Sequence, residues 1–172
     1  MRSPEGQPDD PRVRAILRRA MIVRLATRSP AGGPFVTPIW FVVAGDRLIM
    51  ATGAQTVSVR NLRAHPEAVL LLDADRHRRD AGMLSLRGPA TVRLGPPSFG
   101  ELVRLARKYY LGGLRVELAN LARQRLRQRY YAQSEPAVIE VRPQSAALLP
   151  YPGVASDYAD TAESLTSLGR FP

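Results

Sequence analysis

Three residues near the middle of the chain have types and spacing suited to binding a phosphate group. Thr56, Ser58 and Arg60 open a short segment that is predicted to be a helix ending at His65-Pro66. The first N–H groups of a helix lack intrahelical acceptors and lie at the positive end of its dipole. Two hydroxyls and a forked cation beside them would complete an anion site. An ordinary capped helix with Arg60 in solvent fits the same residues.

The segments around this helix are typical of strands that would hold it in place. Phe35–Val43 is rich in β-branched and aromatic residues, and Gly45-Asp46 suits a two-residue hairpin turn. Arg47–Thr52 and Glu67–Asp73 are predicted as the strands before and after the helix. The hairpin would form a floor, with the start of the helix aimed at whatever lies on it. The stretch can therefore hold a flat ligand that carries a phosphate.

Two residues in the first of these strands have more than one possible use. Pro38 cannot donate a hydrogen bond to a neighbouring strand, so it marks either an edge of the sheet or a gap that faces a ligand. Trp40 is the only tryptophan. It can stack on a ligand, although a buried position in a core or interface is the commoner use. The sequence leaves both alternatives open.

The remaining segments predict further strands and helices. Strands are expected at Ile22–Arg28, Met83–Leu94 and Ala137–Arg142, and helices at 11–21, 98–110 and 114–131. Gly88-Pro89 predicts a bulge within the longest strand. The buried face of the helix over 98–110 is expected to consist of Leu102, Leu105, Ala106 and Tyr109. About six strands with turn signals between them favour a mainly β fold, a small antiparallel barrel with flanking helices.

Composition narrows the class of protein. With 172 residues and 45% hydrophobic content, we expect one domain over residues 1–150 and a polar tail over 151–172. The absence of cysteine excludes disulfides and thiolate metal sites and fits a cytoplasmic protein. Two histidines far apart argue against a zinc site. No stretch approaches the ~20 apolar residues of a membrane helix.

The net charge of +10 comes almost entirely from arginine, because Lys108 is the only lysine. Such a charge attracts nucleic acid or phosphorylated cofactors. Runs of charge more often mark solvated faces, and we favour that interpretation for most of these arginines. The basic face of the helix over 114–131 keeps nucleic-acid binding open as an alternative.

The order of these segments resembles that of the pyridoxamine 5′-phosphate oxidase-like, FMN-binding split-barrel proteins. The branch that includes deazaflavin (coenzyme F-420) reductases is the most similar. The stretches that carry the resemblance are RLATRSPAGGPFVTPIWFVVAGDRLIMAT, VSVRNLRAHPEAVLLLDAD, LSLRGPATVRL and AVIEVRPQ, spread over residues 12–142. The resemblance implies a six-stranded antiparallel split barrel. It also implies a homodimer with FMN, or alternatively F-420, in a groove between the subunits.

The resemblance also implies which residues form the cofactor site. The isoalloxazine ring would be lined by Val36, Thr37, Pro38, Ile39 and Trp40 and flanked by Ala51, Thr52 and Gly53. The phosphate would be held by Thr56, Ser58 and Arg60, and the site would be closed by Arg87 and Gly88 of the other subunit. One position departs from the pattern, since related proteins commonly have lysine where this chain has Ser58. A cation beside the phosphate is therefore missing.

The implied function is an oxidoreductase that transfers a hydride between the cofactor and a small organic substrate. The motifs contain no acidic or basic side chain suited to proton transfer, so no catalytic residue is assigned. A non-catalytic carrier or sensor of flavin, deazaflavin or haem on the same barrel is the alternative. Nucleic-acid binding through the arginine-rich helix is a second, less favoured alternative.

Overall fold

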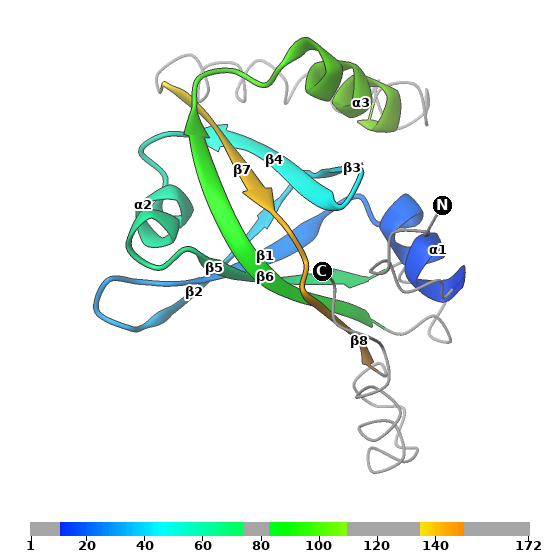
Figure 1. Cartoon of the computed structure of the whole chain (residues 1–172), viewed down its shortest axis with the longest axis horizontal. Helices are drawn as coiled ribbons and strands as arrows, with labels where there is room; N and C mark the ends of the chain where they lie inside the picture. Colours follow the sequence, from blue (N-terminus) through cyan, green and yellow to red (C-terminus); the bar gives the residue numbers. More distant parts are fainter. Residues whose placement is uncertain (1–10, 74–82, 110–134, 150–172) are drawn as a thin grey trace, which may run out of the picture.

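The chain folds into a curled antiparallel sheet, a half-barrel with flanking helices (Figure 1). The computed structural model describes residues 11–73, 83–109 and 135–149. In chain order the elements are α1 (Pro11–Arg19), β1 (Val23–Arg28), β2 (Pro34–Ile39), β3 (Val42–Ala44), β4 (Arg47–Gly53), α2 (Val57–Ala64), β5 (Glu67–Asp73), β6 (Met83–Leu94), α3 (Phe99–Tyr109), β7 (Pro136–Val141) and β8 (Ser145–Leu149). The predicted split barrel is confirmed. No helix in the described ranges is long and apolar enough to cross a membrane.

Some predicted segments fall outside these ranges. They are the basic helix over 114–131 and the tail over 151–172. Within the described ranges there are eight strands rather than the six that the resemblance implies. The predicted strand over 35–43 is divided in two, and Ser145–Leu149 forms a strand of its own.

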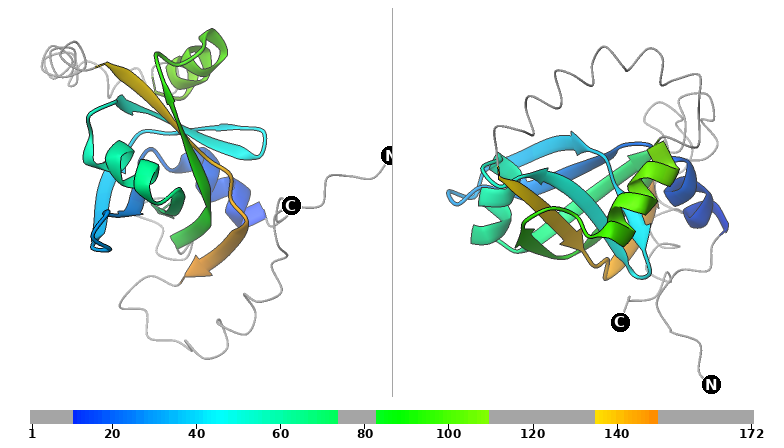
Figure 2. Two further views of the ribbon diagram at one scale, coloured as in Figure 1. Left: turned by 60° about the vertical axis from the view of Figure 1, so that its left-hand side comes forward. Right: turned by 90° about the horizontal axis from the view of Figure 1, so that it is seen from above.

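The division of that strand explains why the barrel is split. The hydrogen-bonded order is β2-β1-β5-β6-β7-β4-β3, with β8 also paired to β6. Thus β2 and β3 follow each other in the chain but lie at opposite ends of the sheet (Figures 1 and 2). Trp40 and Phe41 connect them where no ladder of hydrogen bonds does. Pro38 lies on β2, the edge strand, and is exposed, as the edge interpretation predicts.

The predicted hairpin between β3 and β4 is confirmed. Ala44 pairs with Arg47, which leaves Gly45 and Asp46 as a two-residue turn. Gly45 has a φ of 64°, which the mirror-image turns of tight hairpins require at their first central position. Local turn chemistry therefore sets the register of β4, and β4 in turn leads to the start of α2.

Gly88 lies where three strands crowd together on β6. The first half of β6 pairs with β5 on one side and β8 on the other, and its second half pairs with β7. The chain between β7 and β8 crosses Gly88 so closely that an added Cβ would overlap the carbonyl oxygen of Arg142 and lie 3.0 Å from the amide nitrogen of Gln144. Only glycine fits here, because backbone and not a flexible side chain occupies the space.

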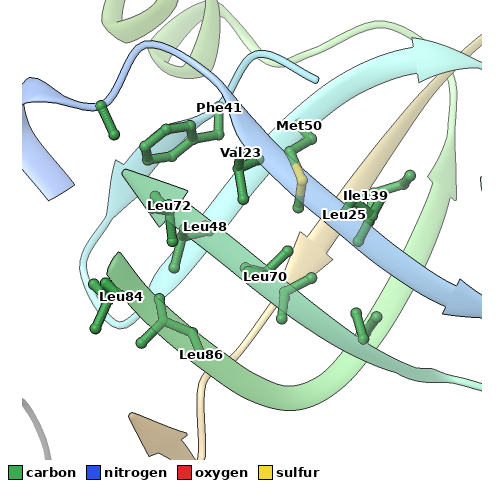
Figure 3. Packing of buried hydrophobic residues seen from close by; sticks show 14 of the residues in the cluster. Val23, Leu25, Phe41, Leu48, Met50, Leu70, Leu72, Leu84, Leu86 and Ile139 are labelled. Atoms are coloured by element: carbon green, nitrogen blue, oxygen red, sulfur yellow. The ribbon is translucent and has the colours of Figure 1, made fainter. Parts of the chain in front are cut away.

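The main core fills the concave side of the sheet. Figure 3 shows its side chains pointing toward one another from several strands. They include Leu25 of β1, Met50 of β4, Leu70 of β5, Leu86 of β6 and Ile139 of β7, all at most 2% exposed. Burial on this scale supplies most of the stabilising free energy of such a domain.

A second, smaller cluster lies on the outside, under α3. It contains Val42, Ile49, Val138 and Tyr109, with Trp40 packed against it. The predicted buried face of α3 is only partly correct, since Leu102 is 48% exposed and Ala106 is exposed, whereas Glu101 is buried. The reason is electrostatic. Glu101 accepts hydrogen bonds from Arg93 of β6 at 2.8 and 3.1 Å and from the N–H of Ser98 at 2.6 Å, which turns this face inward.

Replacing Gly88 with alanine tests the crossing. We expect a loss of about 2–3 kcal/mol or more in unfolding free energy, because the new methyl group must displace backbone. Urea denaturation followed by circular dichroism measures it. Gly100→Ala is the matched control, since its Cβ would meet only the flexible end of Arg104 at 3.3 Å. The control should be neutral or slightly stabilising, and equal losses in both variants would contradict this account.

Candidate cofactor-binding site

The predicted phosphate-binding residues lie in or next to the first turn of α2. We call this N-terminal end of the helix, together with the turn that leads to it from β4, the mouth of α2. β4 ends at Gly53, a short turn follows, and the N–H of Arg60 makes a helical bond to the carbonyl of Thr56. Thr56 is the N-cap residue, as predicted, yet its side chain caps no backbone N–H. Its hydroxyl instead lies 3.5 Å from that of Thr52. The mouth therefore presents two neighbouring hydroxyls beside the first N–H groups of the helix, a set of donors suited to an oxyanion.

Ser58 and Arg60 lie on different faces of α2. Ser58 is 3% exposed and faces the body of the protein, whereas Arg60 is exposed. Successive residues of a helix are 100° apart, so residues two positions apart lie on nearly opposite faces. Ser58 thus contributes chiefly its backbone N–H. Arg60 reaches an anion at the mouth only when its long side chain extends toward the N-terminal end of the helix.

A buried pair of polar side chains fixes the underside of α2. The side-chain amide of Asn61 donates to the hydroxyl of Thr27 on β1 at 3.1 Å, and both residues are at most 5% exposed. Nδ1 of His65 lies 3.2 Å from the guanidinium of Arg28. Among the described residues, no group of three or more His, Asp or Glu side chains is placed to hold a metal ion.

The predicted ring-lining residues alternate along β2. Val36 and Pro38 are exposed on one face, and Thr37 and Ile39 are half-buried on the other. They do not form one continuous wall. Ala51, Thr52 and Gly53 form the end of β4 opposite β7, so they adjoin the mouth of α2.

Trp40 follows β2 and stacks on Tyr109 of α3, with ring centroids 4.5 Å apart and planes 10° apart. One face of the indole is therefore covered, and the core position that is commoner for a tryptophan describes it well.

Arg87 lies on the first half of β6, where it pairs with Val69 of β5 on one side and with Ser145 of β8 on the other. Its guanidinium contacts Glu67 at 3.2 Å, with both side chains 66% exposed. Gly88 beside it is buried under the crossing chain, which gives it a structural role.

The C-terminal end of α3 packs on the connection between β2 and β3. The Tyr109 hydroxyl accepts a hydrogen bond from the N–H of Phe41 at 2.8 Å and lies 2.9 Å from the carbonyl oxygens of Phe41 and Met21. Burial raises the pKa of Tyr109 to about 12, despite the opposing hydrogen bond from Phe41. The ammonium of Lys108 lies 3.4 Å from the centroid of the Phe41 ring. Burial lowers the pKa of Lys108 to about 8.

The sequence as a whole matches a known family. The model of the pyridoxamine 5′-phosphate oxidase family matches residues 9–149. The chain belongs to this family. No curated protein sequence matches it.

Solved structures agree with this family assignment at the level of the fold. An F-420 reductase is 22% identical, with a TM-score of 0.56 over 77% of this chain and 94% of the other. The heme storage protein HutZ from Vibrio cholerae is 13% identical, with a TM-score of 0.56 over 83% and 95%. A putative pyridoxamine 5′-phosphate oxidase from Listeria innocua is 16% identical, with a TM-score of 0.54 over 80% and 94%. These neighbours therefore share one fold, while their names point to more than one ligand.

Sequence reasoning missed the residues that support this site. An asparagine inside a short helix is unfavourable without a partner, so Asn61 could have been flagged. The Ser98–Glu101 spacing is that of a capping box, which would have identified Glu101 as the residue that folds back on Ser98. Nothing local indicates that Tyr109 meets Phe41, because 68 residues separate the two in the chain.

Replacing Lys108 with methionine should remove a pH-dependent part of the stability. The pKa of Lys108 is lowered from 10.5 to about 8 in the folded protein. Between these values the unfolded chain binds more protons, so the contribution of Lys108 to stability rises with pH. We expect the difference in unfolding free energy between wild type and Lys108→Met to shift in favour of wild type from roughly pH 7.5 to 9.5, measured by urea denaturation. A difference that does not vary with pH would contradict the burial of this amine.

Proposed function

We propose that this protein binds FMN or the deazaflavin F-420 between two subunits and acts as an oxidoreductase on a small organic substrate. The observation that carries the proposal is the mouth of α2. The hydroxyls of Thr52 and Thr56 lie 3.5 Å apart there. The side chain of Thr56 accepts no hydrogen bond from the N–H groups of the first turn, so these donors remain available. These donors fit the phosphate end of either cofactor. Bound there, the cofactor would supply the hydride chemistry, while the chain binds and orients it.

The surface that would form the dimer is a row of residues across the outer face of the sheet. Val36 of β2 pairs with Ala26 of β1, Ala26 pairs with Val69 of β5, and Val69 pairs with Arg87 of β6. Val36 is 57% exposed and Val69 is 37% exposed. An apolar row on an otherwise charged surface favours contact with another protein surface.

The order of residues in this row fits a two-fold dimer. Two-fold contacts are self-complementary, so an axis through the middle of the row, between Ala26 and Val69, superimposes one end on the other. Val36 of one protomer would then face the partner's Arg87. Both were assigned to the cofactor site from the resemblance, Val36 from one subunit and Arg87 from the other. The row supports that division of the site between two chains.

Two described residues of the types that ligate haem iron are already engaged by other groups. A haem iron usually takes a histidine, cysteine, methionine or tyrosine ligand. His65 has Nδ1 against Arg28, its Nε2 is buried, and the hydroxyl of Tyr109 is held by backbone groups. A carrier of flavin without turnover fits the same mouth. Nucleic-acid binding relies on arginines outside the described ranges, so no described contact supports it.

Cofactor binding is tested by the visible absorption spectrum of the purified protein during titration with FMN and with F-420. We expect saturable binding of one of them and no Soret band after addition of haemin. Failure to bind either cofactor at micromolar protein would overturn the proposal. If the bound cofactor can be reduced but passes its hydride to no acceptor, the protein is a carrier and not an enzyme.

Arg60→Ala should weaken cofactor binding about 10- to 100-fold, the equivalent of one charge-assisted hydrogen bond to phosphate. Arg63→Ala is the matched control, because Arg63 is an exposed arginine in the last turn of the same helix. It should bind as wild type does. Isothermal titration measures both variants, and equal effects would show that Arg60 acts only through the overall charge.

Val69→Glu should dissociate the dimer, because it places two carboxylates near the two-fold axis on an apolar row. Leu102→Glu is the control, an equally drastic change at an exposed apolar residue on α3. Light scattering after size-exclusion chromatography gives the mass of each variant. A dimer that tolerates Val69→Glu but dissociates with Leu102→Glu would place the interface on α3.

A further inference from the structure

α3 carries apolar side chains on two of its faces and lies outside the sheet (Figures 1 and 2). Leu105 and Tyr109 belong to the face that packs into the smaller cluster. A second face is exposed and apolar at helical spacing (i, i+3, i+4, i+7), and we call it the outer stripe of α3: Phe99, Leu102, Val103 and Ala106. Phe99 is 83% exposed, and Leu102 and Val103 are 48% and 49% exposed. A helix that is apolar on more than one face is typical of a helix packed on more than one side.

The positions of the neighbouring strands require the chain to return along α3. The chain leaves α3 at Tyr109 and enters β7 at Pro136. The carbonyl of Pro136 accepts the N–H of Gly95 at 2.8 Å, so β7 begins beside the end of β6. The first turn of α3 lies there as well, because Glu101 binds Arg93 of β6. The residues between α3 and β7 therefore start at one end of α3 and finish near its other end.

The sequence of these residues suits a second helix that runs antiparallel to α3. Residues 110–134 lie outside the described ranges, and the sequence predicts a helix over 114–131. Gly112-Gly113 comes directly before it and suits the short turn of a helical hairpin. The first apolar positions on one side of this helix are spaced four and three residues apart: Leu114, Leu118 and Leu121.

The spacing of these leucines is that of the outer stripe in reverse order. Along α3, three residues separate Phe99 from Leu102, and four separate Leu102 from Ala106. Antiparallel packing brings the two sets together as pairs: Leu114 with Ala106, Leu118 with Leu102, and Leu121 with Phe99. The next position on the same side of the predicted helix is Arg125, and in this register it would lie beyond the start of α3. The apolar positions thus end where α3 itself begins.

From this match we propose that residues 114–121 form a helix that covers the outer stripe of α3 in the same chain. Removal of two apolar surfaces from water drives the contact. The connection over residues 110–113 is short, so it keeps the segment at a high effective concentration beside the stripe and favours it over a second copy of the protein. The contact does not depend on a cofactor, so it stands or falls separately from the proposed function.

Paired cysteines test the contact in the full chain, because the natural sequence contains no cysteine. The test variant combines Leu102→Cys with Leu118→Cys, and the control combines Leu102→Cys with Val116→Cys. Val116 lies two positions before Leu118 and so points about 200° away around the helix. The length of chain between the two cysteines is nearly the same in both variants, so chance encounters are equally frequent.

A short bis-maleimide that spans the ~8–10 Å between packed helix axes is the cross-linking reagent. We expect the test variant to cross-link within one chain at least about tenfold faster than the control, followed by intact mass. Equal rates in the two variants would overturn the proposal, because a segment that is not docked brings either position near α3 equally often. A cross-link between two chains, seen as a doubled mass in denaturing electrophoresis, would place a second copy on the outer stripe and would also overturn it.

Alanine variants give a second measurement that needs no cysteine. Leu102→Ala and Leu118→Ala should each lower the midpoint of urea denaturation. The double variant should lower it by little more than the larger single effect, because all three variants lose the same contact. Val116→Ala is the control and should leave the midpoint unchanged. Additive losses, or no loss in Leu118→Ala, would overturn the docking. Both experiments use the protein without added cofactor, so neither outcome bears on the binding of FMN or F-420.

Discussion

One phenolic hydroxyl, that of Tyr109, makes the opening in this barrel energetically tolerable. Between β2 and β3 the chain leaves one end of the sheet and joins the other, so Phe41 has no neighbouring strand to bond with. Phe41 is fully buried, and an unpaired buried backbone group costs about 1–3 kcal/mol. The Tyr109 hydroxyl pairs with its N–H and lies within reach of its carbonyl. A side chain thus takes the place of the missing strand.

Because the sheet is broken between β2 and β3, the surfaces of the half-barrel have different roles. The concave side holds the main core, and α3 covers the outside of β3, β4 and β7. Among the described helices none covers the outer face of β2, β1 and β5 at Val36 and Val69, which are 57% and 37% exposed. Splitting the sheet thus separates a face covered by α3 from an exposed apolar row, and the proposed dimer would use that row.

Local signals predicted much of this fold, and long-range contacts account for what they missed. β5 and β6 have the bounds read from sequence, because alternation and turn residues define them. The mouth of α2 was also predictable from the N-cap position and the following pattern. The opposed faces of Ser58 and Arg60 follow from helix geometry, but the burial of Ser58 depends on the packing of α2 against β1 and β6. The break at Trp40 and the burial of Glu101 depend on partners far away in sequence, which no local pattern encodes.

The missing lysine at position 58 has a structural counterpart. Because Ser58 is 3% exposed, a small side chain fits under α2 there, and the cation must come from elsewhere. In the proposed dimer the partner's Arg87 approaches Val36. Its ion pair with Glu67 joins two exposed side chains, and such pairs contribute only about 0–1 kcal/mol. Arg87 can therefore exchange Glu67 for a ligand anion at little cost. In the proposed dimer, the partner's Arg87 would thus supply across the interface the cation that related proteins commonly have at the position of Ser58.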